Sequence, residues 1–392
     1  MRIGIDCQRI DPSYVGGVNT FTLGLLDGFA AARNGHHFNL YVTESNRGLF
    51  ARFEKPLRCN LVATNTQILR ARRTVCRAAL LSHSSELYRL TSNLAYENIQ
   101  AKMDADCDIL YTPTVTLQSF SSRRPTVLSM HDIQHVHYPE FFSWEKRLSR
   151  TISYKLSAQY AHCLQASSEF IKADVLTHMT PKRVEIISEG VTLEDFAARR
   201  DIAGLRERYH LPDRFLFCPA QLWLHKDHLT ILKALKEIEK REGLKIPLVM
   251  TGARFSAADC IFKYLSEQDM GYVRYLGKVP FEDIVSLYQG CDFQISASLY
   301  EASSLPILEA AAAGTPMIVS RIRPHEELGR TLQLNLFSPG CVEELVNMIL
   351  SVWDDKAKAL TQVAHNRDNI GFYSWRNVAR KYLNLFEEIV NA

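Results

Sequence analysis

The chain has 392 residues, of which 46% are hydrophobic and 23% are charged, and its formal net charge is +3 at pH 7. This is the composition of a globular protein, and the length predicts two domains rather than one. A net charge this small, without a lysine- and arginine-rich tail, argues against a nucleic acid as partner.

The cysteines and the start of the chain indicate a reducing compartment. The nine cysteines are scattered and include no C-x-x-C pair, so they predict neither a disulfide framework nor a zinc site. Residues 2–6 begin a strand at once, and no uncharged stretch approaches the ~20 residues of a membrane-spanning helix. We expect a cytoplasmic protein that is at most peripheral on the cytoplasmic face of the inner membrane.

Strand-like runs and helical patterns alternate through the first half of the chain. Apolar runs typical of buried strands occupy residues 2–6, 37–42, 108–112, 126–130, 161–167 and 184–188. Helices are expected from Gly16-Gly17 to about residue 33, over 67–103 as one long and mostly helical segment, over 144–160, and from a Ser167-Ser168 cap to 179. The stretch 196–212 is polar and helical, and we expect the hinge between two domains there.

The same alternation restarts in the second half. Strand-like runs lie at residues 215–218, 248–251, 273–276, 293–297 and 317–320, and helical patterns at 228–240, 257–267, 281–289, 306–313 and 342–353. Such a pattern predicts a doubly wound parallel sheet. We therefore expect an α/β protein with Rossmann-like domains at 1–195 and 196–370 and a terminal helix within 371–392.

The stretch 299–319 carries the most informative motif. It predicts a helix that begins near Pro306, which a first helical turn tolerates, and that ends at Gly314. The N-terminus of such a helix presents unpaired N–H groups and a positive dipole end at the carboxyl edge of the sheet, where a phosphate can bind. Glu301 and Glu309 flank this position, so it suits a nucleotide sugar. The alternative is an ordinary strand–helix unit with two solvated glutamates.

This motif resembles the donor site of the retaining family 4 glycosyltransferases, which have the GT-B fold. The shared features are Glu301 and Glu309 with seven residues between them, Leu305-Pro306, and a Gly-Thr-Pro tail from Gly314. The resemblance implies that Glu301 contacts the transferred sugar and that Glu309 contacts the ribose.

The loop between the two glutamates departs from the family pattern. The family usually has glycines after its first Glu, where this chain has Ala302, Ser303 and Ser304. Backbone N–H contacts survive that change, although the room for the sugar is smaller. The donor-binding residues implied on this loop are Ser303, Ser304, Leu305 and Pro306.

Gly16 and Gly17 head the first helix, where glycines let a backbone come close to a ligand. A dinucleotide fingerprint would begin immediately after the first strand, and this pair comes about ten residues later with the wrong spacing, which argues against NAD. The pair resembles the family's Gly-Gly element, which faces the donor diphosphate and the acceptor. The alternative is a simple turn.

The run from His131 to Pro139 has three histidines and allows two interpretations. A metal site is one, but His135 and His137 are two residues apart, and the Tyr-Pro pair that ends at Pro139 breaks the helix that would align His131 with His135. The other is a resemblance to family members that include many mannosyltransferases, which places His131 in the crevice near the donor sugar. A structural histidine remains an alternative.

Lys226 resembles the family lysine at a helix mouth in the second domain. Fixed positive charge is needed where the nucleoside diphosphate leaves, because negative charge grows there. Gln221 stands where the family has an arginine, and His225 would assist in its place. Lys278 and Val279 follow the third strand of this domain, and their backbone would contact the nucleobase edge, as in the family. A solvated lysine is the alternative for Lys226.

The start of the 67–103 segment is basic and amphipathic, with Arg70, Arg72, Arg73 and Arg77 among apolar residues. Such a helix can lie on an anionic membrane, which suits an enzyme that extends a lipid-linked glycan. The alternative is a solvated helix face.

The resemblance covers nearly the whole chain and implies a two-domain GT-B enzyme. It would bind the donor mainly in the second domain and the acceptor mainly in the first, with the terminal helix crossing back to the first domain. We expect a retaining, metal-independent hexosyltransferase without a cofactor, which uses GDP-mannose or, next, a UDP-sugar and a glycan or lipid-linked glycan acceptor of surface polysaccharide synthesis. Two alternatives are a catalytically silent nucleotide- or glycan-binding scaffold and a nucleotide-sugar epimerase of the same fold.

Overall fold

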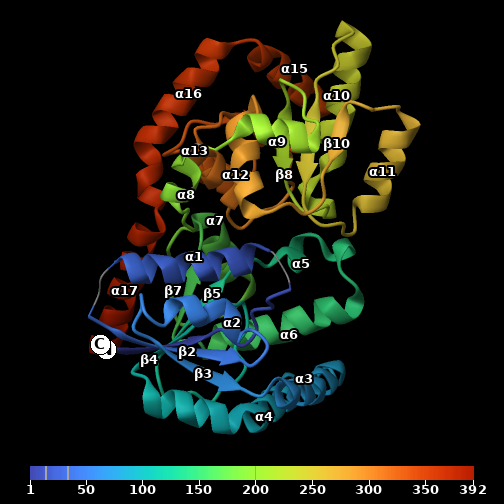
Figure 1. The fold of residues 1–392 in the computed structure, drawn as a ribbon. Coiled ribbons are helices and arrows are strands. Elements are labelled where there is room, and N and C mark those ends of the chain that lie inside the picture. Colours follow the sequence, from blue (N-terminus) through green and yellow to red (C-terminus); the bar gives the residue numbers. More distant parts are fainter. Residues whose placement is uncertain (14–15, 33–34, 199) are drawn as a thin grey trace. The chain divides into compact units, whose positions relative to one another are not determined.

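The computed structural model describes residues 1–13, 16–32, 35–198 and 200–392. They form two compact units (Figure 1): unit 1 is Met1–Gly190 with Trp375–Ala392, and unit 2 is Val191–Ser374. The division lies at 190/191 and 374/375, not at the 195/196 and 370/371 positions expected from the sequence. The Val191 N–H donates to the Tyr373 carbonyl at 2.8 Å, which ties both ends of unit 2 together.

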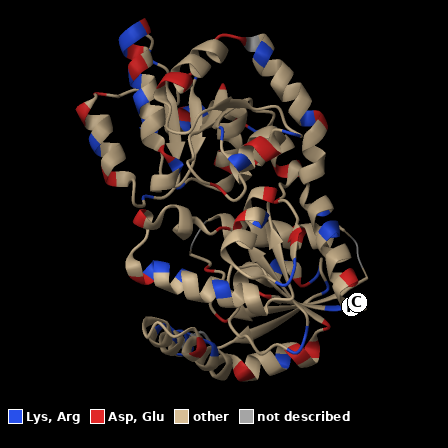
Figure 2. Cartoon of the chain, turned by 180° about the vertical axis from the view of Figure 1, so that it is seen from behind, with Lys and Arg blue, Asp and Glu red and all other residues tan. Residues whose placement is uncertain are grey.

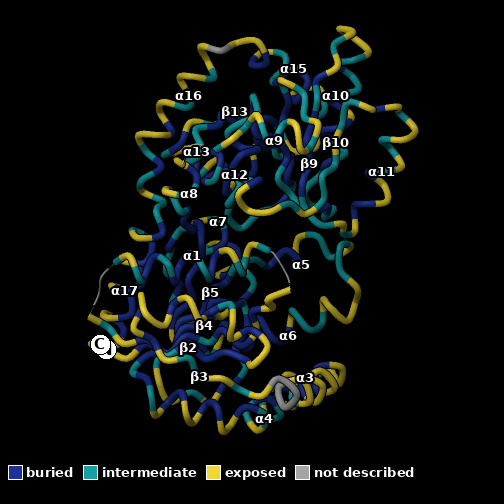
Figure 3. Tube along the Cα trace, in the orientation of Figure 1, coloured by how far each residue is buried: buried dark blue, intermediate teal, exposed yellow. Residues whose placement is uncertain are grey.

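The described residues of unit 1 form an all-parallel sheet of seven strands. Their order is β3-β2-β1-β4-β5-β6-β7, and their bounds are β1 (Arg2–Asp6), β2 (His37–Thr43), β3 (Asn60–Thr64), β4 (Ile109–Thr112), β5 (Thr126–Met130), β6 (Cys163–Ala166) and β7 (Val184–Ile186). The central strands are buried, as expected for a parallel sheet covered on both faces (Figure 3). The strand order reverses between β1 and β4, so this pair forms the topological switch point of the unit.

Helices surround this sheet. They are α1 (Gly17–Ala31), α2 (Arg47–Phe50), α3 (Thr66–Leu81), α4 (Ser85–Asp106), α5 (Gln134–His137), α6 (Trp144–Tyr160), α7 (Glu169–His178) and the C-terminal α17 (Trp375–Asn391). The helix α17 packs on α1 at close range, because Gly24 and Gly28 leave room for Trp375 and a Cβ at either position would collide with it. Gly190 faces the same indole.

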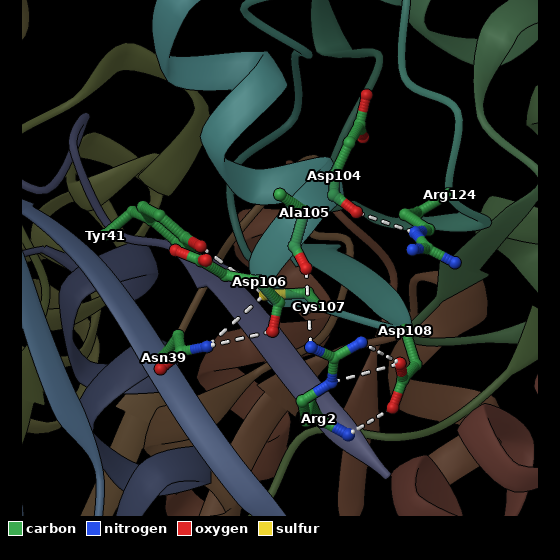
Figure 4. Close-up of polar contacts among 9 residues, drawn as sticks. All are labelled: Arg2, Asn39, Tyr41, Asp104, Ala105, Asp106, Cys107, Asp108 and Arg124. Atoms are coloured by element: carbon green, nitrogen blue, oxygen red, sulfur yellow. Dashed lines mark hydrogen bonds and ion pairs between the residues drawn. The ribbon is translucent and has the colours of Figure 1, made fainter.

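The amino edge of this sheet is fixed by a polar cluster (Figure 4). Arg2 donates from its backbone N–H and from Nη2 to the two carboxylate oxygens of Asp108, each at 2.7 Å. Beside it, the thiol of Cys107 contacts the Tyr41 hydroxyl at 3.4 Å, and burial raises the pKa of this thiol. The cluster joins β1, β2 and β4 at the edge opposite to the one at which open sheets bind ligands.

In unit 2, the part of the chain that the structure describes forms a second all-parallel sheet, of six strands. The order is β10-β9-β8-β11-β12-β13, with bounds β8 (Leu216–Pro219), β9 (Leu248–Thr251), β10 (Val273–Tyr275), β11 (Phe293–Ser296), β12 (Met317–Ser320) and β13 (Asn335–Phe337). Successive residues of β8 point to opposite faces: Leu216 belongs to one apolar core and Phe217 to the other. The switch point of this unit lies between β8 and β11.

The helices of unit 2 cover both faces of its sheet. They are α8 (Leu193–Ala197), α9 (Ile202–Tyr209), α10 (His228–Glu242), α11 (Ala258–Glu267), α12 (Phe281–Gly290), α13 (Leu305–Ala313), α14 (Arg323–Leu328), α15 (Val342–Trp353) and α16 (Lys356–Asn369). Figure 2 shows positive and negative residues interspersed on the helices of both units, in keeping with the small net charge.

Most predicted elements are confirmed, and the errors have physical reasons. The segment expected as one helix over 67–103 is two helices, α3 and α4, broken where His83 adopts φ 60°. The strands β3 and β13 were missed because they are short sheet-edge strands in which most residues are only partly buried. The helix expected to about residue 33 ends at Ala31, and residue 33 itself lies outside the described residues.

Candidate active site

Two loops meet at the switch point of unit 2, and each brings one predicted site residue. A short 3-10 turn, Leu224–Lys226, follows β8, and Lys226 is its last residue. Glu301 lies between β11 and α13. The Lys226 ammonium and the Glu301 carboxylate form an ion pair with Nζ–Oε1 at 2.5 Å. Their side chains are 17% and 12% exposed. The Leu299 N–H donates to the His225 carbonyl at 2.8 Å and holds the two loops together.

The surroundings of Glu301 keep its carboxylate ionised. Burial by itself raises the pKa of Glu301, but the positive charges of Lys226 and His225 and the hydrogen bonds from Lys226 and Ser298 outweigh it, so the net pKa is lowered. The Ser298 hydroxyl donates to the same Oε1 at 2.6 Å. No other described residue bonds to Oε2, and Nζ of Lys226 has two further hydrogens. A ligand can therefore use both groups without breaking the pair.

The helix α13 begins four residues after Glu301. Its N-cap residue Ser304 makes no side-chain capping bond, Pro306 in its first turn has no N–H, and it ends at Gly314 in the left-handed conformation with φ 73°. Within the described chain, no acceptor binds the backbone N–H groups of Ser303 and Leu305. These groups and the helix dipole make this end attractive for an anion. Both predicted bounds of the helix are confirmed within one residue.

Glu309 lies one turn inside α13 and is held by a different partner. The Tyr288 hydroxyl of α12 donates to Glu309 Oε2 at 2.8 Å. Burial raises the pKa of Glu309, and this hydrogen bond offsets part of the rise. In the described part of the chain, Glu309 has no ion pair or hydrogen bond with Lys226 or Glu301. Tyr288 and Ser298 were not singled out from the sequence, because only packing reveals which glutamate each of them serves.

Gln221 does not supply the charge of the arginine that it replaces. Its Oε1 accepts a hydrogen bond from the Ala253 N–H at 3.0 Å, which joins the loop after β8 to the loop after β9. Next to it, the rings of Trp223 and Phe255 stack with centroids 3.8 Å apart and an interplanar angle of 9°. This aromatic pair was also missed, since its members lie on separate loops.

Lys278 and Val279 follow β10 at the same edge of the sheet. Lys278 is exposed and Val279 is half-buried. The residue before them, Gly277, adopts φ 71°, and its carbonyl accepts a hydrogen bond from the Gly252 N–H at 2.8 Å. The loops after β8, β9, β10 and β11 thus form one continuous edge in unit 2.

The remaining predicted site residues belong to unit 1. Gly16 is the extended N-cap of α1, and a Cβ added at Gly17 would meet no atom within 4 Å, so space is open at this helix end. His131 follows β5, its ring meets the Phe21 ring of α1 at 4.8 Å, and its Nε2 lies 2.7 Å from the Pro113 carbonyl. Because a carbonyl only accepts, Nε2 carries the proton. Burial lowers the pKa of His131, so the ring is neutral and Nδ1 is an acceptor.

The three histidines of the 131–137 run do not converge. His135 packs against the Tyr154 ring, and His137 Nε2 bonds the Asp174 carboxylate at 2.7 Å, whereas His131 bonds a backbone carbonyl. In the part of the chain that the structure describes, no group of three or more His, Cys, Asp or Glu is arranged to hold a metal ion. Among the described helices, none is long and apolar enough to span a bilayer.

Comparison with known proteins identifies the family. The model of Glycosyltransferase Family 4 matches residues 15–195, and that of Glycosyl transferases group 1 matches residues 213–355. The O-antigen chain mannosyltransferase B of Escherichia coli is 22% identical over 266 residues, which cover 67% of this chain and 70% of that protein. The UDP-Gal:alpha-D-GlcNAc-diphosphoundecaprenol alpha-1,3-galactosyltransferase of Escherichia coli is 29% identical over 243 residues, 56% of this chain and 60% of that one.

A solved structure shows the same fold. The crystal structure of Anabaena Alr3699/HepE in complex with UDP and glucose aligns with a TM-score of 0.75 and 18% identity, and the alignment covers 99% of this chain and 100% of that chain. With two parallel Rossmann-like sheets, the chain has the GT-B fold. The chain therefore belongs to the family 4 glycosyltransferases, and its relatives include mannosyltransferases of O-antigen synthesis.

Proposed function

We propose that the protein is a retaining hexosyltransferase that takes a hexose from a nucleoside diphosphate sugar without a metal ion. The observation that carries this proposal is the Lys226–Glu301 pair at the switch point of unit 2, beside the N-terminus of α13. Open parallel sheets bind ligands at such a point, and a cation together with a helix N-terminus stabilises a leaving diphosphate.

Each residue then has a distinct role. Lys226, assisted by His225, stabilises the diphosphate as it leaves, while Glu301 accepts hydrogen bonds from hydroxyls of the transferred sugar. Glu309 accepts hydrogen bonds from the ribose. No covalent nucleophile is assigned. The acceptor oxygen forms its bond to the anomeric carbon on the face from which the diphosphate oxygen departs, and the leaving phosphate takes the hydroxyl proton. Bond formation on that face gives retention of configuration. The neutral His131 of unit 1 accepts a hydrogen bond from the donor sugar at Nδ1.

Unit 2 binds the donor in this proposal, and unit 1 binds the acceptor. GDP-mannose is the favoured donor because the relatives include mannosyltransferases, and a UDP-sugar is next because the HepE complexes contain UDP and UDP-glucose. A lipid-linked glycan acceptor agrees with the name of the galactosyltransferase relative, which acts on a diphosphoundecaprenol-linked sugar.

A thermal-shift panel with GDP, UDP, dTDP and ADP, with and without magnesium, tests the donor site. A ligand at ~100 times its dissociation constant stabilises the native state by about 2.7 kcal/mol, which is readily measured. We expect one diphosphate to raise the melting temperature of the wild type without magnesium and to have little effect on Glu309→Ala. A panel without any shift would favour a silent scaffold. The anomeric configuration of the product, read by NMR, tests retention.

We also propose that unit 1 contacts an anionic membrane through α3 and α4. Of the four arginines of α3, Arg70, Arg73 and Arg77 are exposed, although Arg73 also donates to the Gln8 carbonyl at 3.1 Å. Arg72 is half-buried and lies over the Tyr96 ring at 6.0 Å. On α4, three exposed leucines at helical spacing form an apolar strip, the α4 leucine strip: Leu87, Leu90 and Leu94. Exposed arginines near an apolar helix face suit an anionic bilayer surface.

A further inference from the structure

A pocket of about 620 Å³ lies at the carboxyl edge of the unit 1 sheet. Its walls are the loops after β1 and β4, the first turn of α1 directly after Gly17, the end of α3 and the first half of α6. β1 and β4 are the strands between which the strand order of unit 1 reverses, so the pocket occupies the position at which open parallel sheets bind ligands. None of the residues predicted from the sequence for the donor lines it.

The described lining of this pocket carries an excess of positive charge. Its cationic side chains are Arg9, Arg77, Lys146 and Arg150, and its carboxylates are Asp11 and Glu145. Arg9 donates to the Thr116 hydroxyl, and Arg150 pairs with Asp132 at 3.0 Å. The side chains of Arg77 and Lys146 form neither an ion pair nor a hydrogen bond with any described residue, and Lys146 contacts Ser143 only through its backbone N–H. Their charges are therefore available to an anion that enters the pocket.

A buried hydroxyl in the same lining also has no partner. Thr114, in the loop after β4, is only 9% exposed, and no described residue or backbone group bonds its Oγ1. Buried polar atoms without a partner are rare in native proteins, because desolvation of such an atom costs free energy. A ligand oxygen in the pocket would satisfy this hydroxyl.

Much of the remaining wall is apolar. Its apolar members are Ile10, Val18, Leu80, Leu81, Val115 and Leu148, together with the ring of Tyr154, and neutral polar residues also line it: Asn19, Thr116, Ser143, Ser149 and Ser153. Leu80 and Ile10 are buried, whereas Leu81 at the end of α3 is exposed, so the apolar surface continues from the interior of the pocket to the outside. A simple anion would gain nothing from this surface, whereas an anion attached to a hydrocarbon chain would bury it.

We propose that this pocket binds the acceptor by a phosphate group joined to a hydrocarbon chain, with Arg77 and Lys146 contacting the phosphate and Thr114 completing its hydrogen bonds. The proposal deepens the proposed function, because it rests on unit 1 as the acceptor-binding unit. In this proposal, unit 1 recognises the phosphate and hydrocarbon end of the acceptor in addition to the acceptor sugar.

The proposal is tested by measuring the binding of farnesyl diphosphate to the full chain by calorimetry. The measurement is made with the stabilising nucleoside diphosphate at saturation, so that the donor site is filled. The pocket variant is Arg77→Gln/Lys146→Gln, and the matched control is Arg70→Gln/Arg147→Gln, which removes the same charge from the same two helices outside the pocket. We expect at least about a tenfold loss of affinity in the pocket variant and less than about a threefold change in the control.

Three further arms fix the chemistry of the ligand. Farnesol has the hydrocarbon without the charge and glucose 1-phosphate the phosphate without the hydrocarbon, and we expect both to bind at least about tenfold more weakly than farnesyl diphosphate. Thr114→Val, which keeps the shape of the side chain, should weaken binding and leave the melting temperature within a few degrees.

Several outcomes would overturn the proposal: no binding to the wild type, equal losses in the two double variants, competition by the nucleotide, or glucose 1-phosphate binding as tightly as farnesyl diphosphate. The shift in melting temperature that a nucleoside diphosphate causes in the wild type is measured in parallel. If that shift is absent while farnesyl diphosphate still binds, the donor assignment fails and the pocket stands. If the shift is present and farnesyl diphosphate does not bind, only the pocket assignment fails.

Discussion

Lys226 Nζ and Glu301 Oε1 lie 2.5 Å apart although 75 residues separate them in the chain. The pair is mostly buried, and the Ser298 hydroxyl and the positive charge of His225 support the ionised carboxylate. Two roles are therefore combined in one contact, since the same atoms stabilise the loops of unit 2 and face the proposed donor.

Separate removal of the two groups distinguishes these roles. Lys226→Met leaves a buried carboxylate without its cation, and we expect it to destabilise the protein by about 3–5 kcal/mol and to abolish turnover. In Lys226→Met/Glu301→Gln neither charge of the pair remains, so most of the stability should return while turnover stays absent. Thermal unfolding measures the stability, and a transfer assay measures the turnover. Arg241→Gln, which breaks an exposed ion pair with Glu343, is the control and should change neither. A double variant that regains turnover would exclude Lys226 from the chemistry.

Glu309 should bind the donor in its ionised form. Burial raises the pKa of Glu309, and the Tyr288 hydroxyl counteracts this by donating to Oε2. Tyr288→Phe should therefore raise that pKa further. As the pH is lowered into the mildly acidic range, the KM for the donor should begin to increase at a higher pH in this variant than in the wild type. Glu309→Gln should lose most donor affinity at every pH. The readout is the KM for the donor across pH, and identical profiles for Tyr288→Phe and wild type would contradict this role.

Gly17 and Gly28 allow a comparison within one helix. A Cβ at Gly17 meets no atom within 4 Å, so Gly17→Ala should fold with unchanged melting temperature but lose turnover if a ligand approaches this backbone. A Cβ at Gly28 would collide with the Trp375 backbone, so Gly28→Ala should lower the melting temperature by several degrees. Normal turnover of Gly17→Ala would remove the helix end from the site.

Buried neutral histidines should make the protein sensitive to acid. Burial lowers the pKa of His325 from 6.5 to about 4, and burial does the same for His228. The unfolded chain takes up a proton near pH 6.5 that the folded chain accepts only near pH 4, so stability falls as the pH drops through this window and each residue costs up to roughly 3 kcal/mol at its lower end.

His325→Asn tests this dependence. The His325 Nδ1 lies 2.7 Å from the Ser320 carbonyl, and an asparagine amide can donate the same hydrogen bond without titrating. We expect the variant to be less stable than wild type at pH 7.5 because of the lost volume, but to lose less stability between pH 6.5 and 4. Denaturant unfolding at several pH values gives the dependence of the unfolding free energy on pH for the wild type and for the variant. Equal dependences would show that His325 is not the titrating group.

The membrane proposal predicts co-sedimentation with phosphatidylglycerol vesicles at low salt. The strip variant Leu87→Ser/Leu90→Ser/Leu94→Ser and the charge variant Arg70→Gln should each reduce binding, and moderate salt should reduce it further. Leu360→Ser, which changes an exposed leucine of unit 2, is the control. Changing all four arginines of α3 would also remove the Arg73 bond to Gln8, so single exposed arginines are the better test. Wild-type protein that stays in the supernatant would contradict the proposal.

The sequence predicted local features well and long-range contacts poorly. The helix after Glu301 was predicted because Pro306 and Gly314 act within their own turns. The pairing of Glu301 with Lys226 depends on the meeting of two loops across the sheet, which no local pattern encodes. The partner of Glu309, Tyr288, was missed for the same reason. The pocket of unit 1 collects its cations from three separate segments and could be recognised only once they were packed.

The three glycines around Trp375 also decide how the protein can be divided. Gly24, Gly28 and Gly190 receive the first residue of α17, and Tyr382 and Phe386 of that helix pack against the rings of Phe29 and Tyr111. Unit 2 is one uninterrupted segment and can be expressed as residues 191–374. Unit 1 is encoded in two pieces, so a fragment ending at residue 190 would leave aromatic core surface uncovered. To produce this unit alone, a designer would join residue 190 to residue 375 through a short linker, as when an inserted domain is excised from its host.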